Sequence, residues 1–358
     1  MSHQELNEAK EIKLKKWGNE SLKYLYKEYY SLNPPLILPK DIKNREFAFQ
    51  LFESTSYVRH ISFDNERKFL EYLTKNVPKQ VYYSIAVYDL PEASTMEEKG
   101  WRGSDLLFDL DLDHMKDCKI VEDIADDECI ENGIKYVNTI SLIVDNFLGG
   151  YTQIYFTGNR GYHVRGFCDY CKQLGKDERI EIANFIAAQG IDLDLIFPKS
   201  SKAGKAAKPN KDDPGWRGLI ARNGLKDEFD GEDIINIVKS IKVDIDIMVT
   251  QDPSRLTRIP GTLNGKASLL VVPICGEFKM GKWLSPFSGN LDVKAEKELN
   301  EMKILGQKVS FKEKEDLNLP AQLAIFLFTK KYINVIGGDV VVRKNTGWWP
   351  IQGCNWTS

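Results

Sequence analysis

Apolar and polar residues recur along this chain with two different periods, and these periods predict helices that alternate with strands. Apolar residues three and four positions apart indicate helices over residues 5–31, 64–76, 128–148, 177–189 and 230–241. Runs rich in β-branched and aromatic residues indicate strands over residues 81–88, 104–112, 152–156 and 269–274. Asp64 is placed to cap the second helix and Pro78 to end it. The alternation of elements favours a mixed α/β core.

Composition places the chain among globular proteins. Its 358 residues, 42% of them apolar, suffice for one large domain with a subdomain or for two domains. The charged N-terminus MSHQELNEAKEIKLKK contains no apolar run, and the segment 321–328 is too short to cross a bilayer. We therefore expect an intracellular, cytoplasmic protein with no membrane association. In that compartment the six cysteines are expected to be reduced thiols.

Charge is nearly balanced, with 49 basic and 52 acidic residues, so any binding of nucleic acid must rest on local clusters. One such cluster is the lysine-rich segment 199–215, whose Gly, Pro and Ser content predicts a loop. This basic loop is compatible with a solvated linker or with contact to a phosphate backbone. The C-terminal segment 337–358, which contains Trp348, Trp349 and Trp356, is compatible with packing on the core or with binding a partner.

The stretch LLFDLDLDH, residues 106–114, carries an aspartate at every second position of an apolar run. Side chains alternate across a strand, so Asp109, Asp111 and Asp113 are predicted to share one face. Neighbouring carboxylates repel one another unless a cation lies between them, and Mg²⁺ and Mn²⁺ prefer such oxygen ligands. The pattern is also compatible with an acidic face that only contacts water.

The stretch YFTGNRGYHV, residues 155–164, predicts a strand, a turn and a second strand. Gly158 and Gly161 allow backbone amides to approach an anion closely. Arg160 offers two parallel hydrogen bonds to phosphate oxygens, and His163 offers one more. Such turns are common, but this one follows an acidic strand, and together they supply complementary parts of a phosphate site.

A third segment, KVDIDIMVTQDPSRLTRIPGTLNGK, covers residues 242–266. Its VDIDI run repeats the alternation of the acidic strand and places Asp244 and Asp246 on one face of a predicted strand. Arg255, Arg258 and Lys266 follow closely. A further carboxylate would complete a site for two metal ions, and the cations would hold a triphosphate. Taken alone, the segment is also compatible with a surface strand that has charged flanks.

In this order, the three segments resemble the catalytic (small) subunit of the archaeal and eukaryotic DNA primases, the archaeal form most closely. Two flanking segments agree, NREFAF at 44–49 with YVRHISF at 57–63, and MEEKGWRGSDLLFD at 96–109. The resemblance covers residues 20–290 and continues more weakly to about 335. It implies a primase catalytic core with a central mixed β-sheet flanked by helices, plus a smaller helical or irregular insertion.

The resemblance also implies roles for individual residues. The family's metal carboxylates fall on Asp109, Asp111 and Asp246, and Asp252 is the alternative for the third position. Asp113 is not assigned as a metal ligand and is expected at the edge of the strand. The family's nucleotide-binding residues fall on Arg59, Thr157, Gly158, Arg160, His163, Arg258 and Asn264. Asn264 is a departure, because the family has a histidine there and asparagine cannot be cationic.

A second departure concerns zinc. The family carries a zinc-binding knuckle between the acidic strand and the glycine-rich turn, whereas residues 115–150 contain only Cys118 and Cys129. The one CxxC pair, Cys168 and Cys171, follows the turn and supplies two of the four ligands that a structural zinc requires. His114 or the other cysteines would have to complete the set, so a zinc site is not favoured.

The activity implied by the resemblance is synthesis of short RNA primers on single-stranded DNA, started without a primer and catalysed with two Mg²⁺ or Mn²⁺ ions. The implied partners are a large regulatory primase subunit, the template, and ribonucleoside or deoxyribonucleoside triphosphates, with a nucleoid association in an archaeal cell. The alternatives are a repair or mobile-element primase-polymerase that prefers deoxynucleotides, a sugar-nucleotide transferase with a DxD motif, and a non-catalytic replication scaffold.

We expect three regions in the chain. The first is a discontinuous catalytic core over 1–190 and 215–310, the second is an inserted basic loop and helical subdomain over 191–241, and the third is a C-terminal extension over 311–358.

Overall fold

Two four-stranded sheets face a common cleft, and the acidic strand belongs to one of them. The computed structural model describes residues 9–13, 17–115, 118–197 and 208–344. The first sheet has the order β15-β10-β11-β7, with β7 (Leu106–Asp111), β10 (Tyr151–Phe156), β11 (Gly161–Phe167) and β15 (Val272–Ile274). The second has the order β12-β4-β2-β3, with β2 (Phe47–Leu51), β3 (Tyr57–Ile61), β4 (Pro78–Ser84) and β12 (Leu256–Arg258).

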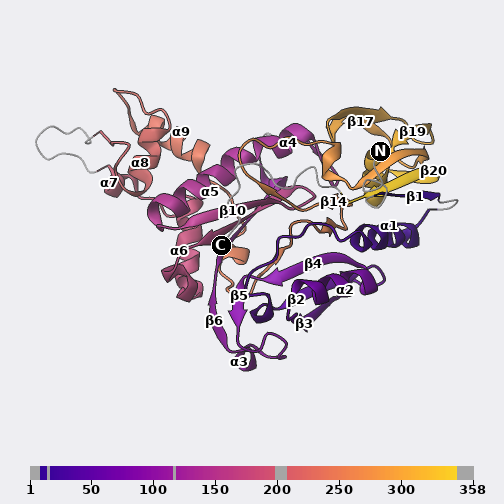
Figure 1. Cartoon of the computed structure of the whole chain (residues 1–358). Coiled ribbons are helices and arrows are strands. Elements are labelled where there is room, and N and C mark those ends of the chain that lie inside the picture. The colour runs from indigo at the N-terminus through magenta and orange to yellow at the C-terminus, as the bar shows by residue number, and fades with distance from the viewer. Residues whose placement is uncertain (1–8, 14–16, 116–117, 198–207, 345–358) are drawn as a thin grey trace, which may run out of the picture.

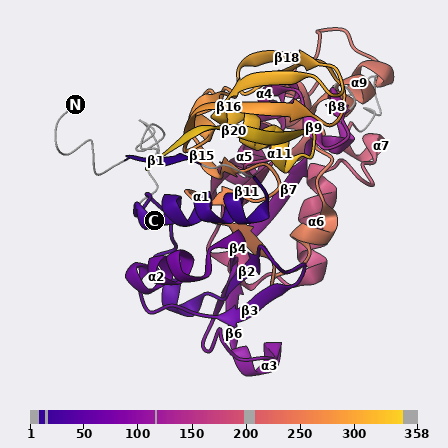
Figure 2. The ribbon, with the colours of Figure 1, turned by 90° about the vertical axis from the view of Figure 1, so that its right-hand side faces the viewer.

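A third four-stranded sheet consists of three C-terminal strands and one N-terminal strand and lies on the opposite side of the molecule from β2 and β3 (Figure 2). Its order is β1-β20-β16-β19, with β1 (Ala9–Lys13), β16 (Phe287–Ala295), β19 (Asp316–Pro320) and β20 (Ile333–Arg343). The two-stranded ribbons are β5 (Ala86–Tyr88) with β6 (Trp101–Ser104), β8 (Ile120–Val121) with β9 (Ile124–Ala125), β13 (Leu263–Asn264) with β14 (Leu269–Leu270), and β17 (Leu299–Ile304) with β18 (Gln307–Phe311).

Helices cover the outer faces of the sheets (Figure 1). The described helices are α1 (Asn19–Ser31), α2 (Glu66–Asn76), α3 (Met96–Lys99), α4 (Asp127–Asn132), α5 (Ile134–Phe147), α6 (Lys176–Ile186), α7 (Leu193–Ile196), α8 (Gly215–Arg222), α9 (Gly231–Ile241), α10 (Ile247–Thr250) and α11 (Ala321–Thr329). Helix α5 packs on β10 and β11, and Phe69 of α2 packs on Phe47 of β2 with 5.1 Å between ring centroids. None of the described helices is long and apolar enough to cross a membrane.

The mixed α/β class is confirmed, but the expected central mixed sheet is replaced by antiparallel sheets. Every pairing between described strands is antiparallel. Most of the predicted elements are present with shifted ends. The predicted helix over 128–148 is two helices separated at Gly133, where a Cβ atom would come within 2.7 Å of the Tyr162 ring.

The N-terminal predictions need two corrections. The helix expected over 5–31 begins only at Asn19, because residues 9–13 form β1 and pair with β20, where Ile12 is buried. The second helix is capped by Asn65, whose side chain accepts a hydrogen bond from the Lys68 N–H at 3.1 Å, and Asp64 instead pairs with the Lys68 ammonium.

The C-terminal β-unit, residues 287–343, was not predicted as a folded unit. Strand β16 pairs with both β19 and β20, and α11 packs against β16 and β20. The boundary predicted between residues 310 and 311 therefore falls inside this unit. Gly337 and Gly338 lie within β20, whereas the three tryptophans of the C-terminal segment and residues 199–207 of the basic loop lie outside the described residues.

The prediction of reduced cysteines is wrong for the described part of the chain, in which no cysteine is a free thiol. Cys118 is bonded to Cys129, and Cys168 to Cys171, with Cα–Cα distances of 4.8 and 5.2 Å. Both distances suit a disulfide, and the folding that creates them cannot be read from residue spacing.

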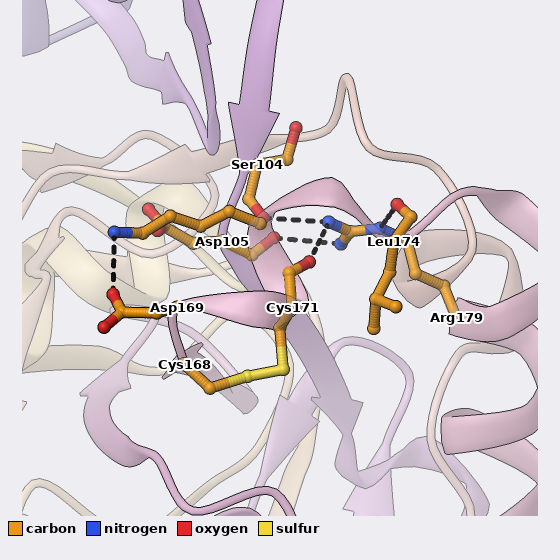
Figure 3. The surroundings of a disulfide bond; sticks show 8 residues. Ser104, Asp105, Cys168, Asp169, Cys171, Leu174 and Arg179 are labelled. Atoms are coloured by element: carbon orange, nitrogen blue, oxygen red, sulfur yellow. Dashed lines mark hydrogen bonds and ion pairs between the residues drawn. A yellow bond between two sulfur atoms is a disulfide. The ribbon is translucent and has the colours of Figure 1, made fainter.

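Beside the second disulfide, the buried Arg179 of α6 ties the start of β7 to the segment that follows β11 (Figure 3). Its guanidinium donates to the carbonyl oxygens of Ser104 and Asp105, both at 2.9 Å, and of Leu174 at 3.0 Å. Burial lowers the pKa of Arg179 to about 10, so the side chain remains charged at neutral pH. These hydrogen bonds hold one end of the strand whose other end carries the acidic residues.

Candidate active site

The acidic strand and the glycine-rich turn are brought together by strand pairing. Strand β7 runs antiparallel to β11, and this register places Asp109 opposite His163 and Asp111 opposite Gly161. Asp109 is half-buried and Asp111 is exposed, on the face of the sheet that is turned toward β4 and β12. The side-chain alternation predicted for these two residues is therefore present.

Asp113 lies beyond the end of the strand. It lies in a 3₁₀ turn, Leu112–His114, that ends the strand after Asp111, and its carboxylate pairs with Arg160 at 2.7 Å. The prediction of three aligned aspartates is corrected on this point, because alternation ends where the strand ends.

A pocket of about 380 Å³ opens between the two sheets in front of Asp109. Its lining comes from both sheets and from the loop before β12. The lining residues are Tyr57, Arg59, Tyr82, Leu107, Asp109, His163, Val249, Asp252, Ser254, Arg255, Leu256 and Arg258. We call it the active-site pocket. It collects carboxylates, arginines and aromatic rings from segments that are as much as two hundred residues apart.

The electrostatics of Asp109 favour a bound cation. Burial, followed by the charges of Asp111 and Asp246, raises the pKa of Asp109 to about 6, while Arg258 and Arg255 act in the opposite direction. Three carboxylates within electrostatic range, all with hard oxygen donors, fit a divalent metal ion. In the described part of the chain, no three acidic, His or Cys side chains already converge as metal ligands.

Asp246 does not lie on a strand, contrary to the prediction from VDIDI. It is the N-cap of α10, and its Oδ1 accepts hydrogen bonds from the N–H groups of Met248 at 2.9 Å and Val249 at 3.3 Å. The Asp246 side chain therefore caps a short helix in a segment that was predicted to be a strand. The Asp246 N–H donates to the carbonyl oxygen of Asp109 at 3.1 Å, which joins the two candidate ligands through the backbone.

Two other acids of this segment have protein partners. Asp252 lines the pocket, but its Oδ1 accepts hydrogen bonds from the N–H of Ser254 at 2.8 Å and from its hydroxyl at 2.7 Å. Asp244 forms an ion pair with Lys242 at 2.7 Å. Asp246 is among the charges that raise the pKa of Asp109.

The Gly158 turn, residues 157–161, connects β10 to β11 as predicted. Thr157 is buried, and its hydroxyl and N–H both donate to the carbonyl oxygen of Gly161 at 3.0 Å. Gly158 has φ +75°, and a Cβ atom there would lie 2.9 Å from the carbonyl oxygen of Leu269. A glycine is needed at this position for two reasons, the backbone conformation and the close approach of β14.

Replacing Gly158 with Ala is expected to destabilise the protein by about 1–3 kcal/mol, because the side chain adds a steric clash to an unfavourable φ. Thermal unfolding measures this effect. Gly149→Ala is the matched control, since Gly149 also has a positive φ of +55° but has no atom within 4 Å of an added Cβ. Equal losses in the two variants would contradict the proposed clash with β14.

His163 is buried beneath Asp109. Its Nε2 lies 3.7 Å from Asp109 Oδ1, and its Nδ1 is hydrogen-bonded to the Thr257 hydroxyl at 3.0 Å. Burial and the nearby Arg258 and Arg165 lower the pKa of His163 to about 3, so the imidazole is neutral at physiological pH. A neutral ring acts through a hydrogen bond and adds no positive charge.

Arg258 and Asn264 belong to one hydrogen-bonded chain. Arg258 donates to Gln80 Oε1 at 2.5 Å and stacks over the Tyr82 ring at 4.8 Å from the centroid. Asn264 is buried, and its amide donates to the carbonyl oxygen of Thr157 at 2.7 Å. The asparagine that departs from the family pattern therefore holds the Gly158 turn in place.

Arg59 reaches the pocket from β3 and is held by Glu46. Its Nε and Nη2 donate to the two carboxylate oxygens of Glu46 at 2.9 and 3.2 Å. Glu46 is fully buried and also accepts a hydrogen bond from Lys99 at 2.5 Å, and its two cationic partners overcome its burial and lower its pKa. No local pattern in the sequence singles out Glu46, Lys99 and Tyr82 as functional residues.

Carboxylates that fit a divalent metal, together with arginines around one pocket, are the groups that a metal-dependent nucleotidyltransferase uses. The model of the DNA primase small subunit family matches residues 108–275. The chain is similar to relatives that carry the name DNA primase small subunit PriS. The protein from Aeropyrum pernix is 46% identical over 91% of this chain and 96% of its own length. The protein from Sulfurisphaera tokodaii is 38% identical over 76% of this chain and 83% of its own length. The protein from Sulfolobus acidocaldarius is 34% identical over 90% of this chain and 97% of its own length.

The chain belongs to the family of DNA primase small subunits and is a catalytic nucleotidyltransferase of DNA replication. The resemblance to the archaeal form is confirmed. Membership implies a divalent metal ion for catalysis, and DNA and nucleoside triphosphates as the molecules on which the enzyme acts. The polymerase domain of Mycobacterium tuberculosis ligase D, solved in complex with DNA, matches 72% of this chain and 80% of its own with a TM-score of 0.38 and 13% identity. That likeness is too distant to support a functional argument.

Proposed function

We propose that this subunit synthesises short RNA primers on single-stranded DNA by joining ribonucleotides at the active-site pocket. The observation that carries the proposal is the position of Asp109, whose pKa is raised to about 6 in a pocket that Arg59 and Arg258 also line. A site of this kind has carboxylates for metal ions on one wall and cations for a triphosphate on the others.

In this proposal Asp109, Asp111 and Asp246 bind two Mg²⁺ or Mn²⁺ ions. The ions would supply activation of the attacking 3′-hydroxyl and neutralisation of the pyrophosphate leaving group. Arg258, Arg160 and Arg59 bind and orient the triphosphate, and neutral His163 and the backbone of Gly158 give it hydrogen bonds. Thr157 and Asn264 hold the turn that carries Gly158 and Arg160.

The proposed partners are the single-stranded template, ribonucleoside triphosphates and a large regulatory primase subunit, and the proposed location is the archaeal nucleoid. Purified protein, a labelled ribonucleotide mixture, a single-stranded DNA template and Mg²⁺ or Mn²⁺ test the function directly. Template-dependent RNA products support it. Products made only from deoxynucleotides, or only from an existing primer end, would instead identify a repair-type polymerase.

Replacing Arg258 with Ala is expected to raise KM for the nucleotide by about 10–100-fold with a smaller change in kcat, because a bidentate phosphate contact is lost. Steady-state kinetics of primer extension at varied nucleotide concentration measure this effect. Arg67→Ala on α2 is the control, since Arg67 is exposed, pairs with Glu71 and lies outside the pocket. An unchanged KM in a folded Arg258→Ala protein would remove Arg258 from the triphosphate-binding residues.

A further inference from the structure

Arg160, at the tip of the Gly158 turn, is held by acidic residues on two sides. Its Nη2 lies 2.7 Å from Asp113 Oδ2 and 3.9 Å from Asp111 Oδ2, and its Nη1 lies 2.8 Å from Asp123 Oδ1. The Nε group is buried and has no hydrogen-bond acceptor among the described residues. The guanidinium is thus aimed at the acidic strand by its partners, while one of its donors is not satisfied by the protein.

Asp123 is shared between Arg160 and a lysine from the far end of the chain. Lys330 follows α11 in the C-terminal β-unit, and its Nζ donates to Asp123 Oδ2 at 2.5 Å and to Asn159 Oδ1 at 2.6 Å. Only 1% of the Lys330 side chain is exposed to solvent. A buried ammonium with two oxygen partners is a fixed element, so it anchors both Asp123 and the residue that precedes Arg160 in the turn.

The ribbon that carries Asp123 is itself fastened to the C-terminal β-unit. Glu122, in the turn between β8 and β9, pairs with Lys297 at 2.7 Å. Asp127, at the start of α4, accepts hydrogen bonds from the N–H groups of Leu305 at 2.9 Å and Gly306 at 2.6 Å. The β8–β9 ribbon therefore bridges the C-terminal β-unit and the Gly158 turn.

We propose that Lys330 and Asp123 are positioning residues for nucleotide binding, through which the C-terminal β-unit sets the orientation of Arg160 toward the triphosphate. This inference rests on the proposed function, in which Arg160 contacts the triphosphate. The Asp123 carboxylate forms ion pairs with both Lys330 and Arg160, so the ammonium of Lys330 weakens the attraction between Asp123 and Arg160. Without Lys330, Asp123 binds Arg160 more tightly and Asn159 loses its anchor, and both changes oppose binding of a phosphate oxygen by Arg160.

Lys330→Met is expected to raise KM for the nucleotide about tenfold with little change in kcat, since groups coupled in one network typically show effects of this size. Lys330→Arg, which keeps the charge, is expected to recover part of the loss. Lys294→Met is the matched control, because it breaks the exposed Lys294–Asp316 pair inside the C-terminal β-unit and is not part of the network that holds Arg160. Thermal unfolding is measured for every variant, and Asn159→Ala gives a second route to the effect if Lys330→Met does not fold.

A double-variant comparison separates positioning from general damage. If Lys330 acts through Arg160, adding Lys330→Met to Arg160→Ala leaves KM at the value of Arg160→Ala alone. A tenfold rise on both backgrounds would overturn the inference, as would an unchanged KM in folded Lys330→Met or Asn159→Ala protein. An unchanged KM in Arg160→Ala itself would instead overturn the proposed role of Arg160 in the triphosphate site, so the two failures are distinguishable.

Discussion

Asp109→Asn is expected to lower the rate of primer synthesis on the order of 10³-fold while making the metal-free protein more stable. The loss follows because an amide cannot replace the charged carboxylate that the proposed metal site requires. The gain follows because Asp109 is half-buried beside Asp111 and Asp246, so its charge is unfavourable in the folded state without a cation. A neutral side chain of the same shape removes that repulsion.

The gain in stability has a defined pH dependence. Folding raises the pKa of Asp109 from 3.8 to about 6, so the folded state binds the proton more tightly than the unfolded state. The parent protein therefore loses stability relative to Asp109→Asn as pH rises from about 4 to about 6, and the difference stays constant above that range. Allowing for solvent at this partly exposed carboxylate, the difference above pH 6 is about 1 kcal/mol.

Primer synthesis assays and unfolding in the presence of a chelator at pH 4 to 8 check both parts. Added Mg²⁺ or Mn²⁺ is expected to stabilise the parent and to have less effect on Asp109→Asn. Retained activity in the variant would remove Asp109 from the metal site. A variant less stable than the parent at pH 7 would show that the three carboxylates do not repel one another in the folded protein.

Asp246→Asn is expected to reduce primer synthesis on the order of 10²-fold with little change in thermal stability. Asparagine is as good an N-cap as aspartate, so the hydrogen bonds from Met248 and Val249 to the side-chain oxygen are retained. Only the charge near Asp109 is lost. The effect on the rate therefore reports metal binding without a change in the position of α10.

Asp252→Asn is the matched comparison for Asp246→Asn. Its side-chain oxygen can still accept the hydrogen bonds from Ser254, and it lines the same pocket, but it already pairs with Arg255 at 3.5 Å, whereas Asp246 is a charge that raises the pKa of Asp109. A small effect is expected. Loss of activity in Asp252→Asn together with an active Asp246→Asn would assign the third metal position to Asp252.

Local patterns were sufficient for the elements that position the site. The alternation of Leu and Asp predicted β7, and the two glycines between apolar runs predicted the β10–β11 turn, because strand and turn preferences depend on neighbouring residues. The same reasoning failed for VDIDI. Its alternation is identical in kind, but the segment forms no strand even though the Asp246 N–H bonds to Asp109 of β7, and the Asp246 side chain instead caps a short helix.

Long-range pairing accounts for the other errors. Residues 9–13 lie in a region of helical spacing but add a strand to β20, more than three hundred residues away. The expected compartment and the spacing of the cysteines led to the prediction of reduced thiols. Disulfide formation instead depends on the distance between Cα atoms after folding. The C-terminal β-unit shows no distinctive motif, and its strands find partners only across the sheet.

The sequence by itself determined the acidic strand, the Gly158 turn and, through its ordered motifs, the family and the chemistry. Those features are local, and a few adjacent residues are enough to specify them. Only the tertiary structure decided that Asp246 lies against Asp109, that His163 is neutral and that Lys330 reaches Asp123. These depend on burial and on contacts between residues far apart in the chain, which arise when the sheets and helices pack together.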